Sequence, residues 1–364
     1  MQFVDLVKQY DEYRREIDAA MAQVMNSAQF IMGPQVKELE TALAAFTGSR
    51  HAIGCASGTD ALLLVLMAKG VGPGDEIITT PFTFIATAEV ISLLGATPVF
   101  VDIEDRTFNI DPALIEKAIT PRTKGIVPVS LYGQAADMDA INAIAKKHSL
   151  WVMEDACQSF GASYKGGRSC NLSDFATTSF FPSKPLGCYG DGGAIFTNDD
   201  AVAEMLRALL NHGQQERYRH SWIGINGRLD TLQAAVLIVK LKHFEGEIRR
   251  RNERAAYYTA ALSAHVKTPG VPAHNLSVYA QYTIRVKNRG ALAEKLKMRG
   301  IPTAVHYPVP LHMQMAFSPL GYAKGSLPVS EKVSEEVLSL PMYAQLPQSD
   351  QDKVISAIIA ALKE

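Results

Sequence analysis

The middle of the chain alternates short hydrophobic runs with amphipathic stretches. Between about residues 50 and 200, continuously apolar runs are separated by stretches whose apolar residues recur at helical spacing. Runs of this kind that alternate with helices indicate a mainly parallel sheet covered on both faces. The pattern predicts strands over 51–55, 76–79, 97–102, 125–129, 150–154, 175–180 and 193–197. It predicts helices over 60–69, 85–94, 112–118, 138–148, 200–211 and 229–262.

The pattern changes between residues 263 and 280, where prolines and a glycine interrupt it. Residues 282–286 then alternate apolar and polar side chains, which is typical of a half-exposed antiparallel strand. The chain is therefore predicted to form a large domain over 1–248, which includes an N-terminal arm, and a small α+β domain over 249–364. The remaining elements expected are a strand over 303–307 and helices over 291–299, 329–340 and 350–362.

Charge and composition exclude several classes of protein. The 364 residues include 36 Lys and Arg against 37 Asp and Glu, whereas a dedicated nucleic-acid binder usually has a basic excess. The longest apolar run, 61–68, is far shorter than the ~18 residues that a membrane-spanning helix needs. No secretory leader is visible, so we expect a cytoplasmic location. The four cysteines lie far apart without a Cys-x-x-Cys pair, so no metal site is expected.

The turn after the first predicted strand suits an anion. Ser57, Gly58 and Thr59 open a helix, where backbone N–H groups and hydroxyls can hold a phosphate. The alternative is an ordinary helix cap, because Ser and Thr are favoured there. The segment lacks the Gly-x-x-x-x-Gly-Lys of a P-loop, and the Gly-rich run 187–193 is not a Gly-x-Gly-x-x-Gly motif. Neither ATP nor a dinucleotide is therefore implied.

Three further residues follow predicted strands. Phe84 can stack on a flat ligand, although such an aromatic is more often part of the core. Asp155 can keep a heterocyclic nitrogen protonated or serve as a structural acid. Lys184 follows a buried strand, and a lysine in a dry pocket acts as a nucleophile and base, whereas most lysines are solvated. A phosphate site, a stacking aromatic, an acid and a lysine together describe a site for pyridoxal phosphate.

Over essentially its whole length, the chain resembles the DegT/DnrJ/StrS family of nucleotide-sugar aminotransferases, which are fold-type-I pyridoxal-phosphate enzymes. The resemblance implies an α/β fold with a mostly parallel central sheet, flanking helices and a smaller C-terminal domain. It also implies transamination, because the relatives that act as dehydratases carry histidine at the position of Lys184. Its most specific segments are 57–62, 154–158, 179–184 with Gly192-Gly193, and 224–230 followed by Gln233-Ala-Ala235.

The resemblance implies roles for individual residues. Lys184 corresponds to the lysine that forms a Schiff base with the cofactor, and Asp155 to the acid that pairs with the ring nitrogen. In the family, the residue similar to Asn226 reaches the phosphate from the neighbouring subunit, which implies a homodimer with shared active sites. The full set implied to bind the cofactor is Ser57, Gly58, Thr59, Phe84, Asp155, Gln158, Ser179, Lys184 and Asn226.

Two segments, 165–173 and 181–191, are similar to the branch of the family that acts on UDP-2-acetamido-2-deoxy-3-oxo-D-glucuronate. The resemblance therefore implies that this keto sugar is aminated with L-glutamate as the donor, for O-antigen or other surface-polysaccharide synthesis. Three other interpretations stay open. They are an aminotransferase for another keto sugar carried on UDP or dTDP, a pyridoxal-phosphate enzyme of another type, and a regulatory protein.

Three residues are candidates for binding the sugar. A guanidinium binds a carboxylate bidentately, so Arg228 suits the sugar acid. Arg228 can equally form a structural ion pair with Asp230 or Glu216. His306 and Tyr307 end a predicted strand and are the other candidates, with simple packing as the alternative.

Overall fold

A seven-stranded sheet forms the centre of the molecule. The computed structural model describes residues 1–364. The strands lie in the order β1-β9-β8-β5-β4-β2-β3, and only β9 runs opposite to its two neighbours. They are β1 (His51–Cys55), β2 (Glu76–Thr79), β3 (Thr97–Phe100), β4 (Thr123–Val127), β5 (Trp151–Asp155), β8 (Phe175–Ser179) and β9 (Gly193–Thr197). The predicted, mostly parallel sheet is confirmed.

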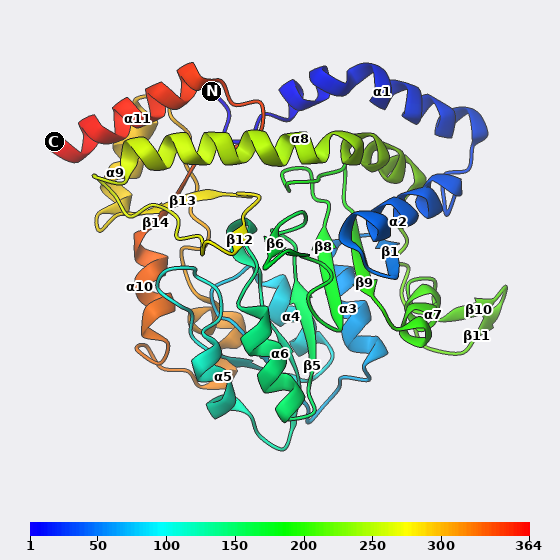
Figure 1. Cartoon of the computed structure of the whole chain (residues 1–364). Coiled ribbons are helices and arrows are strands. Elements are labelled where there is room, and N and C mark those ends of the chain that lie inside the picture. Colours follow the sequence, from blue (N-terminus) through cyan, green and yellow to red (C-terminus); the bar gives the residue numbers. More distant parts are fainter.

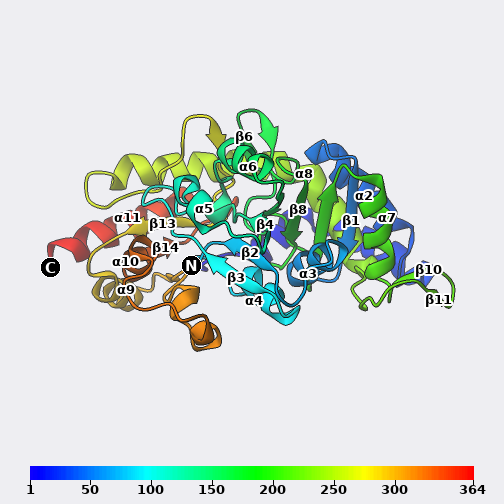
Figure 2. The same ribbon diagram turned by 90° about the horizontal axis from the view of Figure 1, so that it is seen from below.

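Helices cover both faces of this sheet, as its apolar strands require. The helices between and after the strands are α3 (Gly58–Ala68), α4 (Ala86–Leu93), α5 (Pro112–Ala118), α6 (Met138–Lys147) and α7 (Asp200–Leu209). The helices α3, α4 and α7 bury one face of the sheet in a core that includes Leu64, Val90 and Leu206. The helices α5 and α6 cover the opposite face around Ile126 and Ile141. Figure 2 shows α5 and α6 on one side of the strands and α3 and α4 on the other.

Two helices, α1 (Leu6–Ser27) and α2 (Pro34–Thr47), form where the sequence predicts only an arm. The first packs on the long helix α8 (Thr231–Leu262), as Figure 1 shows. Gln9 of α1 forms a buried hydrogen bond with Glu247 of α8 at 2.9 Å. The contact face of α1 therefore combines apolar residues such as Ile17 with the polar Gln9, and hydrophobic periodicity does not detect the polar part.

The C-terminal part contains a two-stranded antiparallel sheet of its own. Its elements are β13 (Tyr282–Arg285), α9 (Arg289–Met298), α10 (Pro328–Glu336), β14 (Val337–Leu340) and α11 (Gln348–Lys363). Two predictions are wrong here. The helix predicted over 329–340 ends at Glu336, because the residues after it pair with β13. The strand predicted over 303–307 makes only the isolated bridge between Ala304 and Ser339.

The strand β13 is antiparallel as predicted, but all of its residues are buried, so the half-exposed prediction is wrong. Tyr282 and Ile284 face the C-terminal core. On the other face, Arg285 forms ion pairs with Asp105 and Glu336, both at 2.6 Å. The polar face of β13 thus contacts charged groups of the protein instead of water. An alternating apolar and polar sequence looks the same in both cases.

The long helix α8 contributes to two cores. Phe244 and Ile248 belong to a core that packs on the central sheet. Ala255 and Tyr258 belong to the C-terminal core. The point at which α8 passes from one core to the other lies close to the predicted domain boundary after residue 248. The boundary itself stays a prediction.

Short elements connect these layers, and one pair projects from them. β10 (Gln214–Glu216) and β11 (Arg219–His220) form a hairpin that stands out at the right of Figure 1. The others are η1 (Leu131–Gly133), β6 (Ser163–Tyr164), β7 (Gly167–Arg168), β12 (Asn275–Leu276), η2 (Leu311–Met313) and η3 (Met315–Leu320). None of the helices is both long and apolar enough to cross a membrane.

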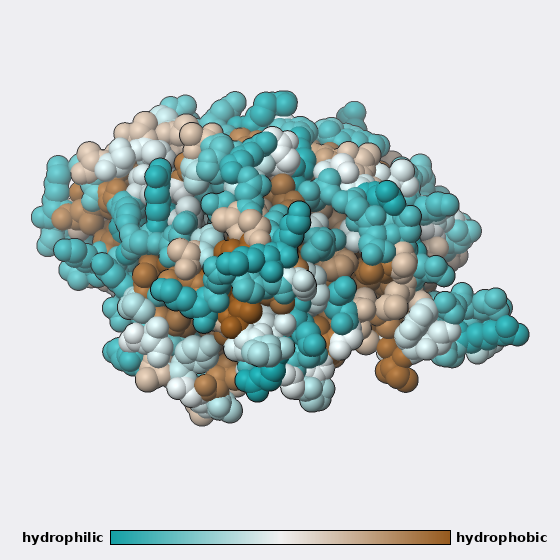
Figure 3. Space-filling model, turned by 60° about the horizontal axis from the view of Figure 1, so that its bottom comes forward, coloured by the Kyte–Doolittle hydropathy of each residue, from teal (hydrophilic) through white to brown (hydrophobic).

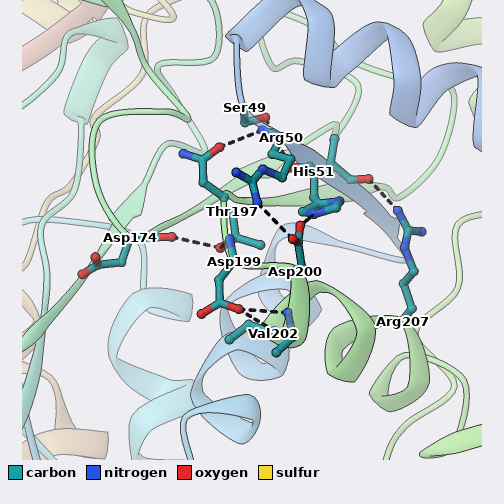
Figure 4. Close-up of polar contacts among 12 residues, drawn as sticks. Ser49, Arg50, His51, Asp174, Thr197, Asp199, Asp200, Val202 and Arg207 are labelled. Atoms are coloured by element: carbon teal, nitrogen blue, oxygen red, sulfur yellow. Dashed lines mark hydrogen bonds and ion pairs between the residues drawn. The ribbon is translucent and has the colours of Figure 1, made fainter.

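Side chains cover the outer edge of β1, which is the last strand of the sheet on its side. Figure 4 shows Arg207 pointing at this edge. Arg207 donates to the carbonyl of Ala52 at 3.3 Å and to Glu40 at 2.8 Å, and Glu40 accepts the N–H of Gly54 at 2.9 Å. Such contacts block pairing with another strand. A cleft of about 600 Å³ runs along this edge and contains none of the predicted site residues.

Candidate active site

The carboxyl ends of the strands meet at one edge of the sheet, which is where open α/β sheets bind ligands. Asp155 ends β5 and Ser179 ends β8. Ser179 and Cys55 lie on the two sides of β9, both opposite Gly193. The turn that follows β1 and begins with Ser57 therefore lies beside the end of β8.

This turn provides hydrogen-bond donors. Gly58 and Thr59 stand in the first turn of α3, so their backbone N–H groups have no helical acceptor. A Cβ atom on Gly58 would approach Cβ of Ser179 to 2.7 Å, so only glycine allows this close contact. The Ser57 hydroxyl accepts the N–H of Asp60 at 3.0 Å and so caps the start of α3, as an ordinary helix cap does. The Ser179 hydroxyl accepts the N–H of Phe181 at 3.2 Å and can still donate its proton. The free N–H groups and the protons of the Thr59 and Ser179 hydroxyls remain for an anion.

The carboxylate of Asp155 is buried without a cationic partner. Asp155 is only 3% exposed. Its two oxygens accept one hydrogen bond each, from the Thr87 hydroxyl at 2.7 Å and from the N–H of Cys157 at 3.1 Å. Buried charges in proteins are normally paired. The position therefore suits a ligand that carries a positively charged N–H group.

Thr87 is a contact that the sequence reasoning missed. It lies on α4, one turn after Phe84, and its hydroxyl also lies 3.3 Å from the carbonyl oxygen of Phe84. A threonine on the buried side of the helix that follows the stacking aromatic was the available signal. Only the packing of α4 against the end of β5 shows that its hydroxyl meets Asp155.

Gln158 connects the sheet edge with the C-terminal part of the chain. Its Oε1 accepts the N–H of Tyr132 at 3.0 Å, and its Nε2 donates to the Tyr307 hydroxyl at 3.2 Å. The Tyr132 hydroxyl donates to the carbonyl of His306. Burial, and next the charge of Asp155, raise the pKa of Tyr307, so its phenol stays protonated.

His306 lies close enough to Lys184 for the charge of the amine to affect it. Burial, and next the charge of Lys184, lower the pKa of His306 to about 4. The imidazole is therefore neutral near neutral pH. Its Nδ1 lies 3.0 Å from the Ser339 hydroxyl.

Lys184 is half-buried in a segment that folds back on itself. Its N–H donates to the carbonyl of Phe181 at 2.8 Å, and the N–H of Cys188 donates to the carbonyl of Phe180 at 2.7 Å. The side-chain amine of Lys184 makes neither a hydrogen bond nor an ion pair within the chain. It is therefore available to a ligand.

Phe84 does not belong to the core, so the packing alternative for it is wrong. Its side chain is 55% exposed. Its ring centroid lies 6.3 Å from that of Tyr307, with the two rings tilted by 41°. An open aromatic face at this edge suits a planar ligand.

Asn226 and Arg228 lie on the segment that follows the projecting hairpin. The Asn226 side chain is exposed and has no hydrogen bond within the chain. Arg228 donates to Oδ1 of Asn211 at 2.5 Å, and its buried Nε has no partner. The alternative ion pairs with Asp230 and Glu216 are absent, so the guanidinium charge is not neutralised within the chain.

The residues at this edge fit pyridoxal phosphate. The unpaired carboxylate of Asp155 suits a protonated ring nitrogen, and the free amine of Lys184 suits an aldehyde. The donors around Gly58 suit the phosphate, and Phe84 suits the ring. No group of three or more His, Cys, Asp or Glu side chains is arranged to hold a metal ion.

Known proteins show similarity over the whole chain. The sequence profile of the DegT/DnrJ/EryC1/StrS aminotransferase family matches residues 11–359. The chain is 56% identical over 363 residues to the UDP-2-acetamido-2-deoxy-3-oxo-D-glucuronate aminotransferase of Pseudomonas aeruginosa, which covers 100% of this chain and 99% of that protein. It is 43% identical to the UDP-N-acetyl-3-dehydro-alpha-D-glucosamine 3-aminotransferase of Acidithiobacillus ferrooxidans, over 98% of this chain and 96% of that protein.

A solved structure extends the similarity to the fold. The crystal structure of NtdA from Bacillus subtilis with bound cofactor PMP matches with a TM-score of 0.91 and 32% identity. The match covers 97% of this chain and 82% of that chain.

Proposed function

Because the chain belongs to the DegT/DnrJ/EryC1/StrS aminotransferase family and is a pyridoxal-phosphate-dependent aminotransferase, we propose that it aminates C3 of UDP-2-acetamido-2-deoxy-3-oxo-D-glucuronate. L-glutamate is the proposed donor. The substrate rests on one observation, the 56% identity over 363 residues to an enzyme of that name. One ketone becomes an amine while one amine becomes a ketone, so no external oxidant or reductant is needed. The cytoplasmic location and the O-antigen role stay predictions.

The side chains at the sheet edge divide the chemical work. When bound, pyridoxal phosphate supplies an aldehyde that condenses with amines and a ring that takes up electrons from the adjacent carbon. Asp155 holds the ring nitrogen in its protonated form. Lys184 removes the proton from Cα of glutamate and, in the second half-reaction, delivers a proton to C3 of the sugar. Gly58, Thr59 and Ser179 bind the phosphate.

Two residues from the C-terminal part border the same space. Burial and the charge of Lys184 keep His306 neutral, so the imidazole adds no positive charge beside the amine of Lys184. Tyr307 keeps its proton and is held by Gln158. Both side chains are proposed to bind the sugar in the space beside the exposed ring of Phe84, which neighbours Tyr307.

Arg228 is proposed to bind the carboxylate of the uronate. Its unneutralised guanidinium supports this role, because it has a neutral partner in Asn211 and an unpaired Nε. The Acidithiobacillus ferrooxidans relative provides the comparison. Its name gives a glucosamine sugar, which has no carboxylate to bind. Removing the charge is therefore expected to change the choice between the two sugars.

The variant Arg228→Gln is expected to lose about 10²-fold in kcat/KM for the uronate, the scale of a lost buried charge pair. With UDP-2-acetamido-2-deoxy-3-oxo-D-glucose, which has a hydroxymethyl group in place of the carboxylate, its kcat/KM is expected to stay within about threefold of wild type. Both are measured by steady-state kinetics, with Arg228→Lys as the variant that keeps the charge. Equal losses on both sugars, or a wild-type enzyme without preference, would favour the alternative of a neutral keto sugar.

We also propose that two copies of the chain share their active sites. Large apolar side chains are exposed near the segment of Asn226, including Ile223, which is 90% exposed, and Ile31, which bridges to Asp230. Figure 3 shows hydrophobic atoms gathered at the base of the projecting part on the right and in the middle of this face. Exposed apolar patches of this kind support an interface. The unpartnered amide of Asn226 is then the group that reaches the neighbouring phosphate.

Mixed dimers test this sharing. When Lys184→Ala and Asn226→Ala chains are co-expressed with different tags, each homodimer is defective. In the mixed dimer, one site has lost both residues and the other has both intact, so about half of the wild-type activity per dimer is expected. A mixed dimer with no more than half the activity of the Asn226→Ala homodimer would show that each site is built from one chain. Isolation on both tags and a glutamate-dependent assay give the measurement.

A further inference from the structure

The segment that carries Lys184 is attached to α8 at two points that the proposed mechanism does not use. The amine of Lys240 donates to the carbonyl of Gly187. Oε1 of Gln233 accepts the N–H of Tyr189 at 2.8 Å. The two side chains lie seven positions apart on the helix, which is about two turns, and therefore share one face of it.

Lys240 is unusual because its amine is buried without contacting a carboxylate. Its exposure is 3%. Besides the carbonyl of Gly187, it has only the ring of Tyr189, with Nζ at 5.2 Å from the centroid. Burial lowers the pKa of Lys240 to about 8, against an opposing effect of the more distant Glu247. Burying an ammonium group without a partner is costly, so the carbonyl of Gly187, its one hydrogen-bond acceptor, is held beside the amine.

The hydrogen bond from Lys240 to Gly187 restrains the backbone of the whole segment 181–189. A Cβ atom on Gly187 would lie 2.4 Å from the carbonyl oxygen of Pro182, so these two residues are in direct contact. Lys184 lies between them in the sequence. The N–H of Cys188 bonds to the carbonyl of Phe180 and closes the same loop. Holding Gly187 and Tyr189 against α8 therefore restricts the backbone of Lys184.

We propose that Lys240 and Gln233 are positioning residues that hold segment 181–189 against α8, so that the amine of Lys184 stays at the edge near Asp155. Neither side chain touches the reacting atoms. The inference rests on the proposed role of Lys184. It adds that the backbone carrying this lysine must be held in place by α8.

The test compares backbone exchange with kinetics. Hydrogen–deuterium exchange of segment 181–189 is measured in full-length protein without added cofactor, and kcat and KM are measured in the holoenzyme. Lys240→Met and Gln233→Leu are each expected to speed exchange of this segment about tenfold, the scale of one lost hydrogen bond, with α11 unchanged. In both variants, kcat is expected to fall about tenfold, while KM for the sugar stays within about threefold.

Matched controls separate positioning from general damage. Lys242→Met removes an exposed lysine from the same helix, and Gln233→Glu keeps an acceptor for the N–H of Tyr189. Both are expected to behave like wild type. Unchanged exchange of 181–189 in both test variants, or equal acceleration along the whole chain, would overturn the inference. If Lys184→Ala stayed active while Lys240→Met loosened the segment, the proposed function would fail and the attachment itself would stand.

Discussion

Lys184→Ala is expected to lower kcat by at least about 10³-fold, because the chain then lacks the amine that we propose to bind the aldehyde and to move the proton. In the structure, this amine has no partner within the chain, so its removal breaks no ion pair or hydrogen bond. The fold of the variant should therefore be unchanged. The measurement is the formation of 2-oxoglutarate from glutamate in the presence of the keto sugar.

The matched control is Lys242→Ala, which removes an exposed lysine of α8. It is expected to keep wild-type kcat. A Lys184→Ala enzyme that retains more than about a tenth of wild-type kcat would be incompatible with the combined role, because general-base catalysis alone usually contributes a hundredfold or more.

Asp155→Asn is expected to lower kcat by about 10²- to 10³-fold, the scale of a lost electrostatic contact to a developing charge. Asparagine keeps the size of the side chain and still offers an oxygen to the hydroxyl of Thr87 or the N–H of Cys157. It lacks the negative charge that is proposed to hold the ring nitrogen protonated. Single-turnover reaction with glutamate alone measures the loss in the first half-reaction, without contribution from the sugar.

The same substitution has an opposite expected effect on stability. The carboxylate of Asp155 is buried without a cation, so a neutral amide avoids the cost of burying that charge. Without cofactor, the free energy of unfolding should be equal to wild type or higher by about 1 kcal/mol. Urea unfolding of the cofactor-free proteins measures this. A variant less stable by more than about 2 kcal/mol would indicate a structural acid, which was the alternative for this residue.

The layered architecture could be predicted because the periods of hydrophobic residues differ between buried strands and helices. The strands over 51–55, 76–79 and 193–197 occur as predicted, since both of their faces are buried. The pattern failed where contacts are polar or non-local. The helix α1 packs on α8 partly through the bond of Gln9 to Glu247, and residues 337–340, predicted as helix, pair with β13.

The proximity of the candidate site residues was predictable as far as chain order determines which strand ends meet. Asp155 and Ser179 end strands that lie side by side in the sheet, so their proximity follows from the parallel topology. The contacts that support them were not predictable. Thr87 reaches Asp155 from a separate helix, and Lys240 reaches the Lys184 segment from α8. Neither contact leaves a periodicity or a local motif, because each depends on how two distant elements pack.

Reduction of the purified holoenzyme with borohydride, followed by peptide mapping in a mass spectrometer, tests most directly whether Lys184 binds the cofactor. The reduced cofactor is predicted on the peptide that contains Lys184 and on no other lysine. Its attachment to a different lysine would contradict the assignment of the active site. A protein that remains colourless and unmodified with added pyridoxal phosphate would contradict amino transfer altogether and favour a regulatory protein.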